Sequence, residues 1–420
     1  MLGKFLVITL VLISSSTLLR AQSSISTLAK AMTEENHAAI LAAVKDAQRA
    51  LGPKAGVPEE PDEYKPIPVK LKLLTKDDAQ FGFSRDFAKL ESMQTWKVGL
   101  DPTKLAYPLR APASVLSGNV AAVRAAMDGA DHCREIAQTA AEFLMWAQNQ
   151  AGSGVFPFPA ARGTSNARAM EAATRFLKNA ERAGKLDAVV RNGWAYDDFG
   201  DGGLQFDNGE CGIAMYEIYE LTQDARYLES ARRATEWAAA RPLCTNWNYN
   251  SFSVELLAKA FEVTGEKRFL ETAIHKARLG VIPGQLTEGP YAGRWFDPHN
   301  ARPAYHYIMM RGLIRLVAAM PFSDSNHDEV LRSLTLGLTA RNEEIITRGV
   351  MNKDKALEAL LLADFYFKSD QDFLDRTRSI EALRIIGKMV SEEYRRGKHP
   401  LAPREWGLFL EAIKRGRIAL

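Results

Sequence analysis

The sequence is poor in cysteine, carries no marked excess of one charge and lacks the short motifs of the common nucleotide, zinc and serine-hydrolase sites. Its 54 basic and 51 acidic side chains leave a formal charge of +3, too small a bias to favour nucleic acid or an anionic membrane as a partner. A phosphate-binding loop, a dinucleotide fingerprint, a zinc-binding helix and a GxSxG turn are missing. The sequence therefore indicates no required cofactor.

The three cysteines are Cys133, Cys211 and Cys244, and their spacing fits neither a zinc site nor a redox pair. One pair could form a disulfide in an exported protein, which would leave an odd thiol. Buried free cysteine is the other interpretation.

The first residues carry the pattern of a secretory signal. Lys4 precedes an apolar stretch from Phe5 to Leu19, and Ala21 offers a small residue for cleavage. We expect residues 1–21 to be a signal peptide and the mature protein to be secreted or periplasmic, with no membrane contact after cleavage. A membrane anchor is the alternative, although the unbroken apolar run is shorter than the ~20 residues of a spanning helix.

Residues 22–118 are expected to hold a helix from Ser26 to Leu51, a proline-dense tether ("GPKAGVPEEPDEYKPIP") and an irregular segment. From residue 119 to 420 apolar residues recur at helical spacing, and stretches that alternate like strands are missing. The fold class predicted is all-α. The helices expected are 119–150 (divided near Gly129), 166–183, 208–221, 225–240, 250–263, 267–279, 303–320, 326–347, 355–368, 371–395 and 404–414.

An internal repeat predicts how these helices are arranged. The segment "DNGECGIAMYEIYELTQDARYLESA" aligns with "YNSFSVELLAKAFEVTGEKRFLETA" at an offset of 42 residues, which pairs Thr222 with Thr264. Each unit reads as a helical hairpin closed by a short polar turn, and such hairpins must stack to bury their apolar faces.

Loop lengths alternate along the repeats. The turns at 222–225 and 264–267 are short, whereas the connections before Asn208, Asn250 and Pro303 are long and rich in aromatic and polar residues. Every second connection of an up-down array lies at the same end. We therefore expect those three helix starts to line one face.

The line "FDNGECGIAMYEIYELTQDARYLESARRATEWA" resembles the six-hairpin (α/α) toroids of carbohydrate-active enzymes, which include unsaturated-glucuronyl hydrolases, α-mannanases, sugar 2-epimerases and polysaccharide lyases. The segment "AEFLMWAQNQAGSGVFPFP" is similar to the helix ends of pectate lyases and cyclases of this build. The resemblance implies a toroid from residue 119 onward and a polysaccharide or oligosaccharide substrate. Function has to be inferred from the site.

The sequence "HNARPAYH" supplies one candidate catalytic set. A uronate lyase must neutralise a carboxylate, remove the adjacent carbon-5 proton and protonate the leaving oxygen, and these tasks suit Asn or Arg and His or Tyr. Toroid-type lyases use the same residue types. The alternative is an ordinary helix start with packed aromatic rings. The candidates are His299, Asn300, Arg302, Tyr305 and His306.

An acidic run supplies the second set, Asp197, Asp198, Asp207 and Glu210. Glycoside hydrolases use paired carboxylates, and the adjacent Asp197 and Asp198 resemble the aspartate pair of the mannanases. Asp197, Asp198 and Asp201 could instead bind calcium in a glycine-rich loop. A plain turn with Asp207 as a helix cap is the structural interpretation.

Aromatic and amide residues on the same loops suggest a sugar-binding cleft, because a flat ring covers the apolar face of a pyranose while amides bind its hydroxyls. The residues singled out are Trp194, Tyr196, Trp247, Asn248, Tyr249, Asn250 and Trp295. The sequence favours a uronate lyase, with a glycoside hydrolase and a non-catalytic glycan-binding toroid as the alternatives.

Overall fold

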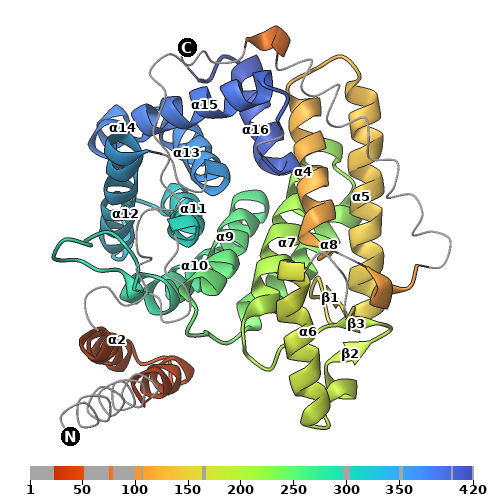
Figure 1. The fold of residues 1–420 in the computed structure, drawn as a ribbon, viewed down its shortest axis with the longest axis vertical. Helices are drawn as coiled ribbons and strands as arrows, with labels where there is room; N and C mark the ends of the chain where they lie inside the picture. Colours follow the sequence, from red (N-terminus) through yellow and green to blue (C-terminus); the bar gives the residue numbers. More distant parts are fainter. Residues whose placement is uncertain are drawn as a thin grey trace, which may run out of the picture.

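The computed structural model describes residues 23–51, 75–78, 100–105, 107–162, 167–296, 303–349, 353–398 and 401–418. Within these ranges six helices form a closed inner ring, because each packs against the next and the last packs against the first (Figure 1). The inner helices are α4 (Arg110–Arg124), α7 (Gly203–Thr222), α9 (Trp247–Thr264), α11 (Pro303–Ala319), α13 (Lys353–Phe367) and α16 (Pro403–Lys414). The all-α toroid predicted from the sequence is confirmed.

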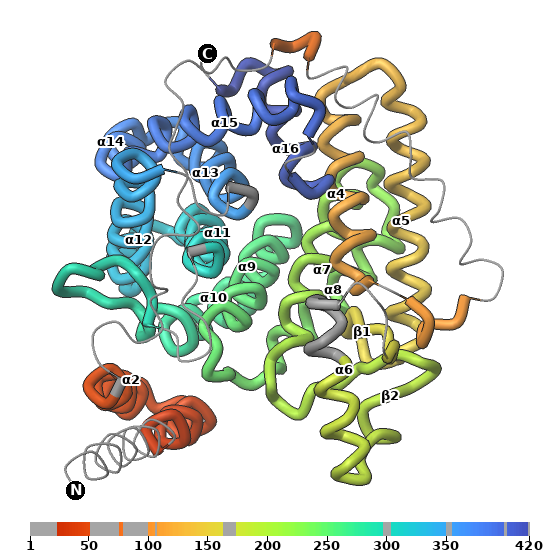
Figure 2. Tube along the Cα trace, viewed as in Figure 1, coloured from red at the N-terminus to blue at the C-terminus, as the bar shows by residue number. Residues whose placement is uncertain are grey.

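A second layer of helices packs outside the ring and alternates with the inner helices along the chain. The outer helices are α5 (Ala130–Ala151), α8 (Ala225–Ala240), α10 (Lys267–Gly280), α12 (His327–Arg348) and α15 (Ser379–Arg395), the last preceded by the short α14 (Gln371–Arg376). In Figure 2 the chain passes once around the ring, which brings the C-terminal α16 beside α4.

The remaining elements decorate this array. After α5 come the two-residue strands β1 (Phe158–Pro159), β2 (Val190–Arg191) and β3 (Trp194–Ala195), which pair antiparallel in the order β1-β3-β2. Helix α6 (Ala167–Arg182) and the 3-10 turn η3 (Leu186–Ala188) lie between them in sequence. The other short turns are η2 (Pro102–Lys104) and η4 (Ile282–Gly284).

The structure corrects three helix boundaries. The expected helix from Ser26 to Leu51 is two helical segments, 23–33 and α2 (His37–Leu51), because Glu35 between them has a left-handed backbone with φ 50°. The first inner helix begins at Arg110 and crosses residue 118, and α5 follows a left-handed Gly129. Asp207 and Asn208 lie inside α7 and Asn250 lies inside α9, so Asp207 is not the helix cap considered from the sequence.

The 42-residue repeat corresponds to two hairpins, α7–α8 and α9–α10. Asn208 and Asn250 occupy equivalent positions in the two hairpins. The Asn208 side-chain amide donates to the Ala234 carbonyl in α8, and the Asn250 amide donates to the Gly280 carbonyl in α10. The repeat therefore extends from the helix pattern to a specific hydrogen bond between the layers.

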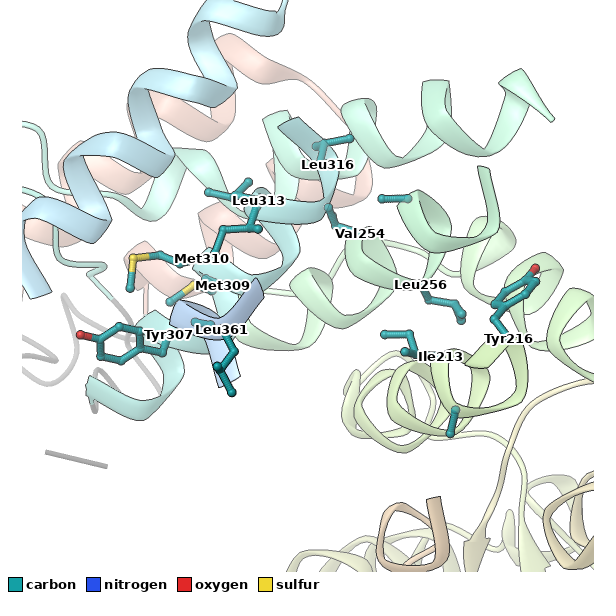
Figure 3. Close-up of a cluster of buried hydrophobic side chains, with 14 of the residues drawn as sticks. Ile213, Tyr216, Val254, Leu256, Tyr307, Met309, Met310, Leu313, Leu316 and Leu361 are labelled. Carbon is teal, nitrogen blue, oxygen red and sulfur yellow. The ribbon is translucent and has the colours of Figure 1, made fainter. Parts of the chain in front are cut away.

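Apolar side chains fill the space between neighbouring helices. Figure 3 shows Ile213 of α7 and Leu256 of α9 together with Met309 and Leu313 of α11, all of them buried. Within the described residues no helix is both long enough and apolar enough to span a bilayer.

The inner helices run parallel, since contacts between them join matching levels. Near their starts Ser253 of α9 donates to Gln205 of α7, and near their ends Lys259 of α9 contacts Glu220 of α7. Arg315 of α11 meets Glu262 at the same far end. The starts of α7, α9 and α11 thus share one end of the ring, as the loop lengths predicted.

Candidate functional site

The end of the ring at which the inner helices begin is here called the mouth. Arg110 opens α4, and its backbone N–H and Nη1 donate to the two carboxylate oxygens of Asp207 at 3.2 and 2.9 Å. Asp207 is fully buried, whereas the Arg110 side chain keeps 25% of its surface exposed. The Arg110 guanidinium also lies 4.2 Å from the ring centroid of Phe206. A cation supported by a carboxylate and an aromatic ring therefore faces the mouth.

Tyr249, in the first turn of α9, lies beside Arg110. Burial, together with the charges of Asp201 and Tyr305, raises the pKa of Tyr249 to about 12, although the Arg110 guanidinium opposes the shift. The phenol is consequently protonated at neutral pH and can donate a hydrogen bond or a proton. Arg110, Asp201, Tyr249 and Tyr305 come from three inner helices and the loop before α7, and they lie together at the mouth.

Close packing at the mouth affects the pKa of Asp207 and the space available at Gly202. Burial raises the pKa of Asp207 above its usual range, although the Arg110 guanidinium works against that shift. Gly202, which precedes α7 with φ +90°, leaves no room for a side chain, because a Cβ there would lie 3.1 Å from the Tyr249 ring and closer still to Cys244.

Below the mouth, buried arginine and glutamate side chains meet at the centre of the ring. Arg311 of α11, 1% exposed, contacts Glu210 at 2.8 Å, Glu255 at 2.6 Å and Glu358 at 2.5 Å. Arg404 of α16 also contacts Glu210 and Glu358. We call Glu210, Glu255, Arg311, Glu358 and Arg404 the central network; it joins α7, α9, α11, α13 and α16.

The central network removes Glu210 from the candidate catalytic residues. Burial raises the pKa of Glu210, but the charges of Arg311 and Arg404 outweigh that effect and hold it below its usual range. A carboxylate that stays ionised between two arginines cannot act as the protonated acid of a hydrolase.

Asp197 and Asp198 have structural partners that the sequence did not reveal. Arg241 binds both carboxylates, and Asp198 also accepts hydrogen bonds from the N–H groups of Gly200 and Leu204. Asp198 is buried and holds the loop against the first turn of α7. It is therefore not available as one member of a catalytic pair.

Calcium binding by Asp197, Asp198 and Asp201 stays a prediction. Two of these carboxylates are already neutralised by Arg241. Across the described ranges no group of three or more His, Cys, Asp or Glu side chains is arranged to hold a metal ion.

Most of the proposed sugar-binding aromatic residues are part of the core. Trp194, Trp247 and Trp295 are completely buried, and the indole N–H groups of Trp247 and Trp295 donate to the carbonyls of Phe296 and Val281. These rings cannot stack on a sugar, which corrects the sequence interpretation.

The two asparagines proposed to bind sugar hydroxyls are buried as well. Asn250 is hydrogen-bonded to Cys244 and Gly280, and Asn248 is 2% exposed. Tyr196 is half-buried under the guanidinium of Arg191. Of this set, Tyr249 is the residue that the structure brings into the mouth.

The sequence "HNARPAYH" divides into two parts. His299, Asn300 and Arg302 lie outside the described residues, so their roles stay predictions. Tyr305 is half-buried beside Tyr249. His306 is 1% exposed and accepts a 3.4 Å hydrogen bond from the Trp295 N–H.

The surroundings of His306 keep its imidazole uncharged. Burial first, and then the charges of Arg341 and Arg294, lower the pKa of His306 well below its usual range. The imidazole is therefore neutral and buried, as in the alternative of packed aromatic rings, and the catalytic role of His306 stays a prediction.

The sequence interpretation missed Arg110, Phe206 and the cationic members of the central network. Arg311 and Arg315 interrupt the apolar run "YIMMRGLIRL", and two arginines on a buried helix signal buried carboxylate partners. The sequence around Arg110 shows no such buried helical pattern, because residue 110 falls in the segment predicted to be irregular.

All three cysteines are free and buried. Cys133, Cys211 and Cys244 thus match the buried-thiol interpretation rather than a disulfide.

A separate groove of about 600 Å³ lies outside the ring, between α2 and the connection that leads toward α11. Lys45 and Arg49 of α2 line one wall, and Leu286, Pro290 and Tyr291 line the other. Helix α2 therefore packs against η4, α10 and the connection that precedes α11.

No family model and no curated protein matches this chain. Among solved structures, a glycosyl hydrolase of family 88 from Bacteroides vulgatus is similar with a TM-score of 0.50 and 11% identity, over 82% of this chain and all of that one.

A polysaccharide lyase (TM-score 0.44, 11% identity, covering 81% of this chain and 97% of that chain) is also similar. So is a mutant unsaturated glucuronyl hydrolase from Streptococcus agalactiae complexed with dGlcA-GalNAc6S (TM-score 0.46, 12% identity, 84% and 97% covered). The chain therefore has the six-hairpin (α/α) toroid fold that the sequence resemblance implied.

Proposed function

We propose that this chain is an exported enzyme that cleaves a uronate-containing polysaccharide by β-elimination at the mouth. The observation that carries the proposal is the set of side chains gathered there: a partly exposed guanidinium, Arg110, and two tyrosines, Tyr249 and Tyr305. The carboxylates suggested for a hydrolase are each bound to an arginine instead.

In this mechanism Arg110 binds the uronate carboxylate and stabilises the negative charge that builds on carbon 5. A base removes the carbon-5 proton, the C–H electrons form the C4=C5 double bond, and the C4–O bond breaks. Tyr249 suits the last step, because its protonated phenol can give a proton to the leaving oxygen. We assign the base to His299, as predicted from the sequence.

A glycoside hydrolase is the second candidate, and Asp207 is the observation that favours it. The raised pKa of Asp207 is a property expected of a general acid. Asp201, which is more exposed, lies near Tyr249. Burial and the bond to Arg110 weigh against Asp207 reaching a substrate. A toroid that binds glycan without cleaving it is the third possibility.

The products distinguish these candidates. The protein is incubated with uronate-containing and neutral polysaccharides, and both ultraviolet absorbance of an unsaturated uronate and new reducing ends are followed. Absorbance supports the lyase, reducing ends without absorbance support the hydrolase, and binding without either supports the non-catalytic toroid.

Replacing Tyr249 by Phe tests the assigned acid. We expect turnover to fall by roughly 10²–10⁴-fold, the usual worth of a positioned acid or base, with circular dichroism unchanged. Tyr219→Phe is the matched control, since Tyr219 is half-buried near the far end of α7. Near-normal turnover of Tyr249→Phe would remove this residue from the mechanism.

A further inference from the structure

Phe199 is an exposed aromatic residue held in an unfavourable backbone conformation. Its ring is 52% exposed, and its φ of 50° lies in the left-handed region that bulky side chains rarely adopt. Exposure gives the ring little burial energy to offset that strain. Strain of this kind, retained by its surroundings, is found preferentially at binding and catalytic sites.

Hydrogen bonds and ion pairs of Asp197 and Asp198 hold the turn that carries Phe199. The Asp197 carboxylate accepts the Phe199 N–H at 2.9 Å, and Asp198 accepts the Gly200 N–H at 3.1 Å. Arg241 then binds both carboxylates. The turn is fixed to the start of α7, because Asp198 also accepts the Leu204 N–H. Phe199 therefore occupies a defined position in the loop before α7, two residues before Asp201.

A cation lies next to the ring. The Lys185 Nζ is 5.5 Å from the Phe199 ring centroid, and the ring of Phe176 supports Phe199 at 6.2 Å. Lys185 is exposed, so its charge is open to a ligand as well as to the ring. A flat apolar surface beside a free ammonium group complements a pyranose ring that bears a carboxylate.

We propose that Phe199 and Lys185 form a remote subsite for a uronate residue of the polysaccharide. Phe199 would stack on the sugar ring, and Lys185 would bind its carboxylate. The proposal rests on the proposed function, since it takes a uronate-containing chain as the ligand. It adds a specificity-determining pair that lies outside the reacting residues.

The test uses the full-length protein and an oligouronate long enough to extend beyond the mouth. Phe199→Gly should weaken binding about tenfold in calorimetry, the worth of one lost stacking contact, while the melting temperature rises because glycine accepts the left-handed backbone. A merely structural Phe199 would not combine weaker binding with greater stability. Lys185→Ala should also weaken binding of the oligouronate while leaving a neutral oligosaccharide unaffected.

Phe322→Ala is the matched control, because Phe322 is also exposed but follows the far end of α11. Oligouronate binding equal to wild type in both Phe199→Gly and Lys185→Ala would overturn the subsite. Failure of the wild-type protein to bind any uronate would instead overturn the proposed function on which the subsite depends.

Discussion

At the scale of single residues, Lys276 of α10 carries a charge that its surroundings only partly compensate. It is 4% exposed, and its Nζ donates to the backbone carbonyl of Arg241. Burial lowers the pKa of Lys276 to about 8, although the charges of Glu35 and Cys244 oppose the shift. At neutral pH the folded state must therefore hold a poorly solvated ammonium group.

Replacing Lys276 by Met should stabilise the protein at pH 7. The difference between the ordinary lysine pKa and about 8 corresponds to about 3 kcal/mol, and the lost hydrogen bond returns about 1 kcal/mol, which leaves a gain of roughly 1–2 kcal/mol.

The pH dependence follows from the direction of this shift. Between pH 8 and about 10.5 the unfolded state binds the proton that folded Lys276 has lost, so wild-type stability gains relative to the variant as pH rises. Urea unfolding at pH 7 and pH 9.5 should show the advantage of Lys276→Met shrinking. An advantage that grows with pH would contradict this account.

At the scale of elements, the two repeated hairpins end their first helices in the same left-handed conformation with different residues. Gln223 has φ 59° at the end of α7, and Gly265 has φ 71° at the end of α9. A helix commonly closes on a glycine at this position because the conformation crowds a Cβ. The turn after α7 therefore carries backbone strain at Gln223, whereas the equivalent turn after α9 avoids it with Gly265.

Exchanging the residues at these turns should change stability in opposite directions. Gly265→Ala should lower the free energy of unfolding by about 1 kcal/mol, since a Cβ there meets no neighbouring atom and only the backbone strain remains. Gln223→Gly should raise it by less than about 1 kcal/mol, because glycine also gains entropy in the unfolded chain. Denaturant unfolding of both variants, with the double variant as a check on additivity, would reveal a same-sign change if this interpretation is wrong.

At the scale of the whole molecule, the central network takes the place that an apolar core would occupy in a smaller helical bundle. Arg311 alone contacts carboxylates from three other inner helices. The attraction is strong because water is excluded, but the same exclusion makes any unpaired charge costly. The network therefore makes the closure of the ring depend on all of its members.

Arg311→Met should destabilise the protein by about 3–5 kcal/mol, because Glu210, Glu255 and Glu358 lose a shared partner. Arg226→Met is the control, because the Arg226 side chain is 64% exposed and solvent screens its ion pair with Asp224. If Arg311→Met does not fold, Arg311→Lys keeps the charge and should give an intermediate loss. Thermal unfolding with equal midpoints for the Arg311 and Arg226 variants would rule out this role for the network.

The sequence by itself determined the helical fold class, the hairpin repeat and the end of the ring at which the long connections gather. These features follow from apolar spacing and turn composition, which act over a few residues and can be read locally. The starts of α7, α9 and α11 accordingly lie at one end of the ring. Each helix begins within five residues of its predicted first residue.

The tertiary structure alone decided which aromatic rings are buried, which carboxylates are paired and which cation opens the mouth. Trp247 and Phe199 both belong to long, aromatic-rich stretches before the predicted helix starts, yet one is enclosed and the other exposed. Arg404 meets Glu210 across 194 residues of chain, and Arg110 meets Asp207 across 97. No local pattern records such pairs, because burial and ion pairing are set by segments that become neighbours only when the ring closes.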